Sequence, residues 1–281
     1  MAKLSSFVLH GTARLNLGPH PERARADAEL LLLHLLGKDK AWLMAHLEEE
    51  LAGNTAARYI ELLERRSKGE PVQYITGETE FYGLPFRVTP DVLIPRPETE
   101  HLVEKVVELA PRFHQPRIVD VGTGSGAIAV ALAHALPRAS ITATDISSCA
   151  LALAEENAKL NDVALRFLEG DLLAPVAGER FDLVVSNPPY VPSADRATLS
   201  VEVRDYEPAL ALFAGDDGLE VYRSLIPAAF DALNSNGFVV LEIGYGQSPA
   251  ITELLGRSGF EQVEFTPDLQ GIPRVACAQR P

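Results

Sequence analysis

The sequence predicts an α/β fold with a mostly parallel sheet of seven strands, preceded by a small helical domain. Two patterns support this prediction. Up to about Lys68, apolar residues recur at three- and four-residue spacing, as they do on one face of a helix. After Glu98, short runs of β-forming residues mostly alternate with helical patterns, and such alternation is typical of a parallel sheet with helices on both faces.

The expected elements of the α/β part follow from this alternation. The candidate strands are Arg117–Val121, Ser140–Asp145, Leu165–Glu169, Phe181–Ser186, Phe238–Ile243, Gln262–Thr266 and Arg274–Ala278. The candidate helices are Ala127–Leu136, Cys149–Leu160, Gly218–Leu233 and Pro249–Arg257. Ligands of such sheets bind beyond the carboxyl ends of the strands, so we expect the functional residues there.

The chain length of 281 residues suits two domains. Residues 1–73 predict a helical domain of four or five helices, with clear periodicity in Ala24–Leu36 and Ala56–Leu63. Residues 74–97 combine prolines, glycines and alternating β-formers, which favours a linker that carries a β-hairpin. Residues 98–281 then form the α/β domain.

Composition narrows the class of protein. The formal net charge of −14, from 39 acidic and 25 basic residues, disfavours a nucleic-acid substrate, although a local basic patch is compatible with it. Cys149 and Cys277 lack metal-ligand spacing and cannot form a disulfide framework, so we expect no metal and a reducing cytoplasm. The longest apolar stretch, Leu30 to Leu36, is too short to span a bilayer, so we expect a protein without a membrane segment.

A glycine-rich turn follows the first strand directly. Its residues are Gly122, Thr123, Gly124, Ser125 and Gly126. Glycines allow a tight turn whose backbone can touch a nucleotide-like ligand. The spacing is G-x-G-x-G, and Ala127 also completes G-x-G-x-x-A, so the turn alone does not separate NAD from S-adenosyl-L-methionine.

Acidic residues follow the next two strands. Asp145 ends the second strand, where its carboxylate can accept hydrogen bonds from both ribose hydroxyls of an adenosine; as an alternative it is only a helix cap, a role that Ser147 or Ser148 can also fill. After the third strand, Asp171 is expected to bond the exocyclic amine of adenine and Leu172 to pack against the ring, but an ordinary surface turn explains this pair almost as well.

The fourth strand ends in Asn187-Pro188-Pro189-Tyr190, which is the most informative stretch of the chain. The two prolines fix the backbone after a buried strand. The Asn187 side-chain oxygen and the Pro188 carbonyl can each accept one hydrogen of a planar NH2 group and aim its lone pair at a methyl donor. Tyr190 would form an aromatic wall beside that group, in a reaction that needs no strong general base.

These motifs resemble those of class I S-adenosylmethionine-dependent methyltransferases, which have a Rossmann-like seven-stranded sheet, and Asn187 to Tyr190 resembles the signature of enzymes that methylate planar nitrogen. Further stretches resemble the release factor glutamine methyltransferase family, that is, the protein-(glutamine-N5) methyltransferases. They are Glu70-Pro-Val-Gln-Tyr-Ile-Thr-Gly77, Phe81-Tyr-Gly83, Ile94-Pro-Arg-Pro-Glu-Thr-Glu100 and Asp216-Asp-Gly-Leu219. The resemblance runs from about residue 20 to the C-terminus.

The resemblance implies methylation of the glutamine in the Gly-Gly-Gln loop of peptide chain release factors, with S-adenosyl-L-homocysteine as the product. We expect a cytoplasmic protein that contacts no nucleic acid directly and is a monomer. It assigns Gly122 to Gly126, Asp145 and Asn187 to the cofactor, and Asn187 to Tyr190 to the substrate glutamine. It also implies that the helical domain helps to recognise the partner. Arg96 and Glu98 are expected to contact the methionine end of the cofactor or a mobile loop, or, for Glu98, to open a helix.

Four alternatives stay open from the sequence. A glutamine of a ribosomal protein, or adenine N6 of a nucleic acid, can serve as the methylated group; the second requires a flipped base and basic target-recognition elements, which this acidic chain does not show. An NAD-dependent oxidoreductase would need a proton donor near the nicotinamide, and no such pairing stands out. A non-catalytic binding module would not require intact Gly122, Asp145 and Asn187.

Overall fold

The computed structural model describes residues 3–281, so the first two residues of the predicted helical domain lie outside the described residues. Two compact units are present. One contains the described residues up to Gly77 together with Leu199–Tyr206, and the other contains Glu78–Thr198 and Glu207–Pro281. The chain therefore leaves the second unit after Thr198 and returns to it at Glu207.

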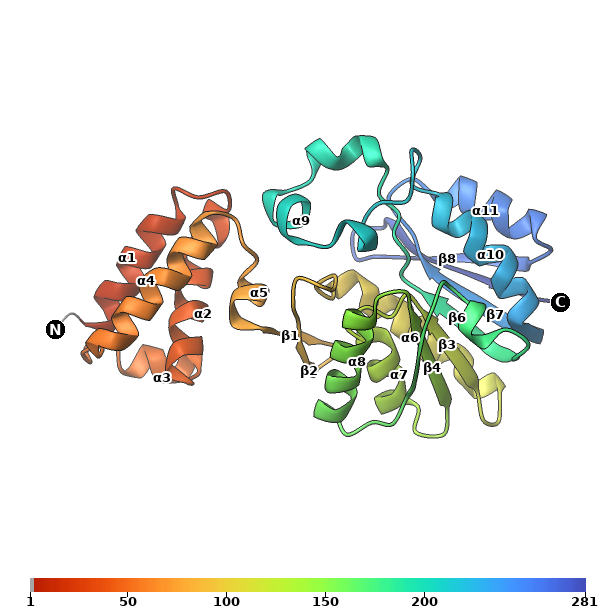
Figure 1. The fold of residues 1–281 in the computed structure, drawn as a ribbon, viewed down its shortest axis with the longest axis horizontal. Helices are drawn as coiled ribbons and strands as arrows, with labels where there is room; N and C mark the ends of the chain where they lie inside the picture. Colours follow the sequence, from red (N-terminus) through yellow and green to blue (C-terminus); the bar gives the residue numbers. More distant parts are fainter. Residues whose placement is uncertain (1–2) are drawn as a thin grey trace. The chain divides into compact units, whose positions relative to one another are not determined.

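The helical unit contains five α-helices before Gly77 among the described residues (Figure 1). They are α1 (Leu4–Leu15), α2 (Ala24–Leu36), α3 (Lys40–Ala45), α4 (Gly53–Ser67) and α5 (Val72–Thr76), with a 3-10 turn η1 (Pro21–Arg23). Apolar side chains of α1, α2 and α4 form its core, and the buried Tyr59 hydroxyl donates to the Ala28 carbonyl at 3.0 Å. The sequence periodicity thus predicted a helical unit correctly.

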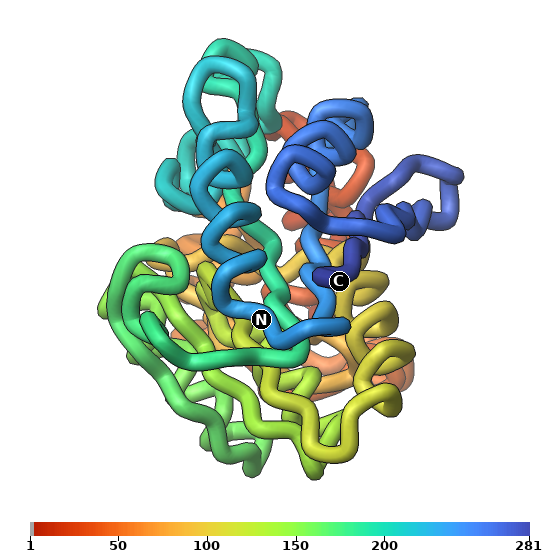
Figure 2. The backbone as a smooth tube through the Cα atoms, turned by 90° about the vertical axis from the view of Figure 1, so that its right-hand side faces the viewer, coloured from red at the N-terminus to blue at the C-terminus, as the bar shows by residue number. Residues whose placement is uncertain are grey.

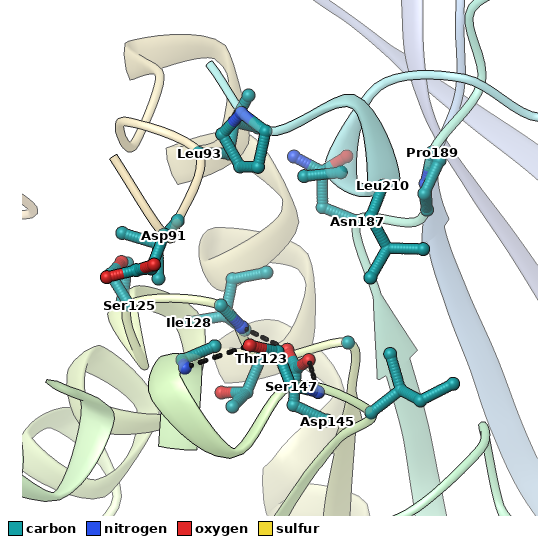
Figure 3. Close-up of a pocket in the computed structure, with 18 of the residues that line it drawn as sticks. Asp91, Leu93, Thr123, Ser125, Ile128, Asp145, Ser147, Asn187, Pro189 and Leu210 are labelled. Atoms are coloured by element: carbon teal, nitrogen blue, oxygen red, sulfur yellow. Dashed lines mark hydrogen bonds between the residues drawn. The ribbon is translucent and has the colours of Figure 1, made fainter. Parts of the chain in front are cut away.

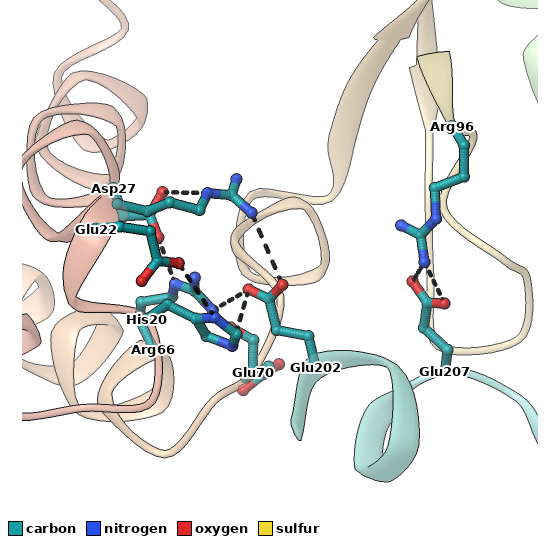
Figure 4. Close-up of polar contacts among 9 residues, drawn as sticks. His20, Glu22, Asp27, Arg66, Glu70, Arg96, Glu202 and Glu207 are labelled. Atoms are coloured by element: carbon teal, nitrogen blue, oxygen red, sulfur yellow. Dashed lines mark hydrogen bonds and ion pairs between the residues drawn. The ribbon is translucent and has the colours of Figure 1, made fainter. Parts of the chain in front are cut away.

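A buried ionic cluster joins α2, α4 and α9 (Val201–Tyr206) within this unit (Figure 4). The Arg66 side chain is only 2% exposed, and its Nε donates to Asp27 Oδ2 at 2.6 Å. Its Nη1 forms an ion pair with Glu202 of α9, which also lies 3.6 Å from the imidazole Nε2 of His20. Burial makes such a pair costly to break, so this cluster holds α9 in the helical unit.

The α/β unit begins with an antiparallel hairpin of β1 (Glu78–Phe81) and β2 (Leu84–Arg87), which confirms the hairpin expected between residues 74 and 97. A 3-10 turn η2 (Pro97–Thr99) and helix α6 (Glu100–Leu109) follow, and a second 3-10 turn, η3 (Ala110–Arg112), leads into the sheet.

The main sheet has seven strands in the order β5-β4-β3-β6-β7-β9-β8. The strands are β3 (Arg117–Val121), β4 (Ser140–Asp145), β5 (Arg166–Glu169), β6 (Phe181–Ser186), β7 (Leu233–Glu242), β8 (Glu261–Pro267) and β9 (Pro273–Gln279). Strand β9 runs opposite to the other six strands, since it is antiparallel to both β7 and β8, and residue Pro281 at the C-terminus follows it closely (Figure 2). The predicted mostly parallel sheet is confirmed.

Alternate residues of the strands enter two separate cores, one on each face of the sheet (Figure 1). On one face, Ile118 and Val185 pack with α6, α7 (Ala127–Ala135) and α8 (Ser148–Leu160). On the other face, Val119 and Val184 pack with α10 (Glu220–Ala232) and α11 (Ser248–Arg257). Both faces are buried because side chains of a strand point alternately to opposite sides.

Two features differ from the sequence prediction. Strand β7 begins at Leu233, five residues before the predicted Phe238, because a register shift against β6 keeps the turn-like residues 234–237 in the strand. The long segment between β6 and α10 carries η5 (Ser193–Thr198), α9 and η6 (Ala209–Ala211), for which the sequence prediction assigned no elements. Val191 and Phe213 close the base of this segment as a β-bridge.

Candidate active site

The candidate site lies at the point where the strand order of the sheet reverses. Strands β3 and β6 are neighbours, but the chain leaves β3 toward β4 and leaves β6 toward β7 on the other side. The crevice beyond their carboxyl ends is the usual ligand site of such sheets. A cavity of about 450 Å³ lies there, entirely within the α/β unit (Figure 3).

The glycine turn from β3 to α7 forms one side of this cavity. Gly122, Thr123, Gly124 and Ser125 line it. A Cβ atom added at Gly122 or Gly124 would meet no atom within 4 Å, so the backbone faces open space at both positions. Gly126 is not among the lining residues; it precedes α7 with φ of 81° and packs against Ala154. The turn thus exposes its backbone to a ligand.

The Asp145 carboxylate is fixed beside the turn, as Figure 3 shows. Its Oδ2 accepts from the Gly124 amide at 2.8 Å, and its Oδ1 accepts from the Ser147 amide at 2.9 Å. Ser147, and not Asp145, caps α8, by accepting from the Ala150 amide at 3.2 Å. Since each carboxylate oxygen has a second lone pair, both remain able to accept from a pair of hydroxyl groups.

Apolar and acidic residues complete the nucleotide end of the cavity. Asp171 and Leu172, which were expected to contact adenine, both line it. The Leu172 carbonyl accepts from the Thr144 hydroxyl at 2.9 Å, which holds this loop against β4. Ile146, which the sequence prediction did not include, also lines the cavity and is 53% exposed. Two aliphatic side chains are therefore available to flank a planar ring.

Asp120, the second-last residue of β3, was missed by the sequence prediction. It is fully buried, and its Oδ2 accepts from the Thr123 hydroxyl at 2.6 Å. Its Oδ1 is buried and has no hydrogen-bond partner among the described residues. Burial is the main cause that raises the pKa of Asp120 to about 7, and the Asp145 charge adds to it. Asp120 is not among the residues that line the cavity, so it acts on the glycine turn through Thr123.

The Asn187 side chain is held by a hydrogen bond to Thr99. Its Nδ2 donates to the Thr99 hydroxyl at 3.1 Å, so the amide oxygen is the group that it can offer to a substrate. Asn187 and Pro189 line the cavity, whereas Pro188 is buried and Tyr190 half-buried, and neither is among the lining residues. The structure therefore brings together most of the predicted site residues, except Gly126, Pro188 and Tyr190.

Tyr190 and Glu242 form a buried polar pair below the site. Glu242, at the end of β7, is 3% exposed, and the Tyr190 hydroxyl lies 3.4 Å from its Oε1. Its Oε2 accepts from the Thr99 hydroxyl at 2.6 Å. Burial is the first cause that raises the pKa of Glu242 to about 7, while Thr99 and Arg274 act against it. Burial also raises the pKa of the Tyr190 phenol, so it stays protonated.

Arg96, which was expected to contact the cofactor or a mobile loop, lies just before η2. It lines the cavity, and its Nη2 lies 2.7 and 2.6 Å from the two oxygens of Glu207 (Figure 4). The Glu207 side chain is only 1% exposed, so this pair fastens the segment after Tyr190 to the segment before α6. Glu98, in contrast, is exposed in the turn before α6.

Residues 3–281 contain neither a metal-binding cluster nor a membrane-spanning helix. No group of three or more His, Cys, Asp or Glu side chains is arranged to hold a metal ion. None of the helices in this part of the chain is long and apolar enough to cross a membrane.

Comparison with known proteins first defines the class. Residues 98–203 match the family model "Methyltransferase small domain", and residues 9–77 match "PrmC N-terminal domain". A methyltransferase from Pyrococcus furiosus has a TM-score of 0.52 at 21% identity and covers 71% of this chain and 90% of its own. The RsmC methyltransferase of T. thermophilus, in complex with AdoMet and guanosine, has a TM-score of 0.53 at 18% identity, with 73% and 50% covered. The α/β unit has the class I methyltransferase fold.

Closer relatives then define the family. The chain is 45% identical over 258 residues to the release factor glutamine methyltransferase of Koribacter versatilis. The aligned region covers 92% of this chain and 91% of the relative. It is 44% identical to that of Deinococcus radiodurans over 282 aligned positions, 99% of both chains. The chain belongs to the release factor glutamine methyltransferase family.

Proposed function

We propose that this protein transfers the methyl group of S-adenosyl-L-methionine to the side-chain amide nitrogen of the glutamine in the Gly-Gly-Gln motif of peptide chain release factors. The observation that carries the proposal is the orientation of Asn187 at the cavity. Its NH2 group is occupied by Thr99, so an amide oxygen remains for the N–H groups of a substrate amide. Membership of the family supports the same substrate.

The residues of the cavity fit this cofactor. Gly122 and Gly124 would contact it through the backbone, and Asp145 would accept from both ribose hydroxyls. Ile146 and Leu172 would flank the adenine ring, with Asp171 at its edge. S-adenosyl-L-methionine supplies a methyl group activated by a positive sulfur.

The protein's own contribution is positioning. An amide nitrogen is a poor nucleophile because its lone pair is delocalised, so it must be held and reoriented during transfer. We propose that Asn187 Oδ1 accepts one N–H of the glutamine. The Pro188 carbonyl would accept the other once the substrate is bound, since Pro188 is not among the residues that line the cavity in this structure. These fixed acceptors also stabilise the positive charge that develops on the nitrogen. Tyr190 supports the motif from below rather than as the expected wall, because its hydroxyl lies beside the buried Glu242.

The partner is proposed to be a protein. Residues 98–281 would form the catalytic domain, residues 74–97 the linker, and residues 1–73 the domain that recognises the release factor, with support from the match of residues 9–77 to the PrmC N-terminal domain. The net charge of −14 favours a protein over a direct nucleic-acid contact. We propose a monomer, and a release-factor substrate implies reaction in the cytoplasm.

A methyl-transfer assay tests the proposal. Labelled S-adenosyl-L-methionine is incubated with the protein and a release factor that carries either Gly-Gly-Gln or Gly-Gly-Ala, and the loop peptide is then analysed by mass spectrometry. We expect label on the glutamine peptide alone. The matched control is Asn187→Ala, which should lose the transfer while its far-UV circular dichroism spectrum stays that of the parent. Label on the Gly-Gly-Ala protein, on a ribosomal protein alone or on nucleic acid would overturn the proposed substrate.

A further inference from the structure

The buried Glu242 side chain ends a chain of directional hydrogen bonds that reaches Asn187. Thr99 lies between the two: its hydroxyl donates to Glu242 Oε2 at 2.6 Å, and the same oxygen accepts from Asn187 Nδ2 at 3.1 Å. Thr99 and Glu242 are 4% and 3% exposed, so water does not compete freely for either group.

The direction of this chain follows from the donor inventory of its members. An ionised carboxylate only accepts hydrogen bonds, and a hydroxyl has a single hydrogen. While Glu242 is ionised, Thr99 must therefore give its hydrogen to Glu242 and accept from Asn187. The Asn187 amide can satisfy this only with its NH2 group toward Thr99, which turns its oxygen away from Thr99.

We propose that Glu242 and Thr99 are positioning residues for methyl transfer: they fix the Asn187 amide in the orientation that presents Oδ1 to the substrate. This inference rests on the proposed function, because it assumes a substrate with an NH2 group. A flipped Asn187 would place its own NH2 group against that of the substrate, where neither can accept. Thr99 lies in the stretch Ile94 to Glu100 that resembles the family, but the sequence assigned it no role, and Glu242 lies outside every motif of the sequence.

Protonation of Glu242 would remove the directional constraint, since a protonated carboxyl group can donate to Thr99 and free the hydroxyl hydrogen for Asn187 Oδ1. The charged and titratable groups around Glu242 come from four elements: Glu98 in η2, Tyr190 after β6, Tyr222 in α10 and Arg274 in β9. Burial dominates among these influences and holds the pKa of Glu242 at about 7. We therefore expect kcat to fall as the pH decreases below 7.

Steady-state kinetics of variants test the positioning role. Thr99→Val removes the hydroxyl with little change in volume and should lower kcat by about 10- to 100-fold, as expected when a reacting group is misplaced. Thr99 lines the cavity, but its hydroxyl is bonded to Glu242 and Asn187, and valine keeps its volume. The affinity for S-adenosyl-L-methionine, measured by calorimetry, should therefore stay within about threefold. Thr99→Ser keeps the hydroxyl and should restore most of the rate.

The pH profile separates positioning from simple structural support. The parent should show an acid limb in kcat near pH 7, and Glu242→Gln should lack this limb, because its amide does not titrate. Parental kcat in Thr99→Val would overturn the inference. The inference would also be overturned if kcat of Glu242→Gln fell near pH 7 as it does in the parent.

An NMR measurement on the protein alone keeps this inference distinct from the proposed function. The side-chain NH2 of Asn187 should show slow exchange in the parent and in Thr99→Ser and fast exchange in Thr99→Val, and its shifts should titrate near pH 7 in the parent but not in Glu242→Gln. If the parent methylates no glutamine, the proposed function fails, and these shifts still decide the orientation of Asn187. Shifts that do not respond to Thr99→Val would overturn the inference.

Discussion

Replacement of Asp120 by asparagine tests whether this buried carboxylate costs stability at neutral pH. Asp120 is fully buried, and burial, with a smaller contribution from Asp145, raises its pKa from 3.8 to about 7 against the opposing effect of Thr123. A raised pKa means that the folded state favours the protonated carboxyl group. The corresponding stability is fully present below pH 3.8 and is lost as the pH rises through about 7.

The magnitude follows from this change in pKa. One pKa unit corresponds to about 1.4 kcal/mol, so the cost reaches about 4 kcal/mol at pH 8 and is below about 2 kcal/mol at pH 5. Asparagine has nearly the same volume and carries no charge. We therefore expect the free energy of unfolding of Asp120→Asn, relative to the parent, to gain about 2 to 3 kcal/mol between pH 5 and pH 8.

Urea unfolding at pH 5 and pH 8, followed by far-UV circular dichroism, measures this gain. Asp231→Asn is the control, because Asp231 is an exposed carboxylate of α10. Trp42 is the only tryptophan of the sequence and lies in the helical unit. Its fluorescence therefore reports the unfolding of the helical unit, and this transition should be the same in all three proteins. A stability difference that does not change with pH, or that Asp231→Asn shares, would refute the reasoning.

Three further substitutions have defined outcomes. Arg66→Met removes the 2.6 Å partner of the buried Asp27 and leaves it only the longer contact with Arg23 at 3.8 Å, so urea unfolding should show a loss of about 3 to 5 kcal/mol in the helical unit; an unchanged midpoint would contradict this. Gly126→Ala places a Cβ 2.9 Å from the Ala154 Cβ at φ of 81°, so the melting temperature should fall by several degrees, a loss of about 1 to 3 kcal/mol. Asn187→Ala removes the proposed acceptor and should lower kcat by about 100-fold or more with an unchanged far-UV spectrum; a parental rate would exclude that role.

Several elements were predictable from the sequence because their signals are local. Strands β3, β4 and β6 have the predicted bounds residue for residue, since short runs of apolar β-formers between turn residues identify strands that are buried on both faces. The segment that contains α9 gave no such signal. Its six residues pack in the helical unit, where Glu202 pairs with the buried Arg66, and that contact joins positions far apart in the chain.

The candidate site divides in the same way. The alternation of strands and helices, the glycine turn after β3 and the Asn187-Pro-Pro-Tyr190 motif after β6 could all be read from the sequence, because each is encoded within a few consecutive residues. Only the tertiary structure placed the last turn before α6 beside the ends of β6 and β7, which are 88 and 143 residues away along the chain from Thr99. Burial of Asp120 and Glu242 raises their pKa values and also depends on neighbours from distant elements. It could therefore not be predicted from the residues next to them in the sequence.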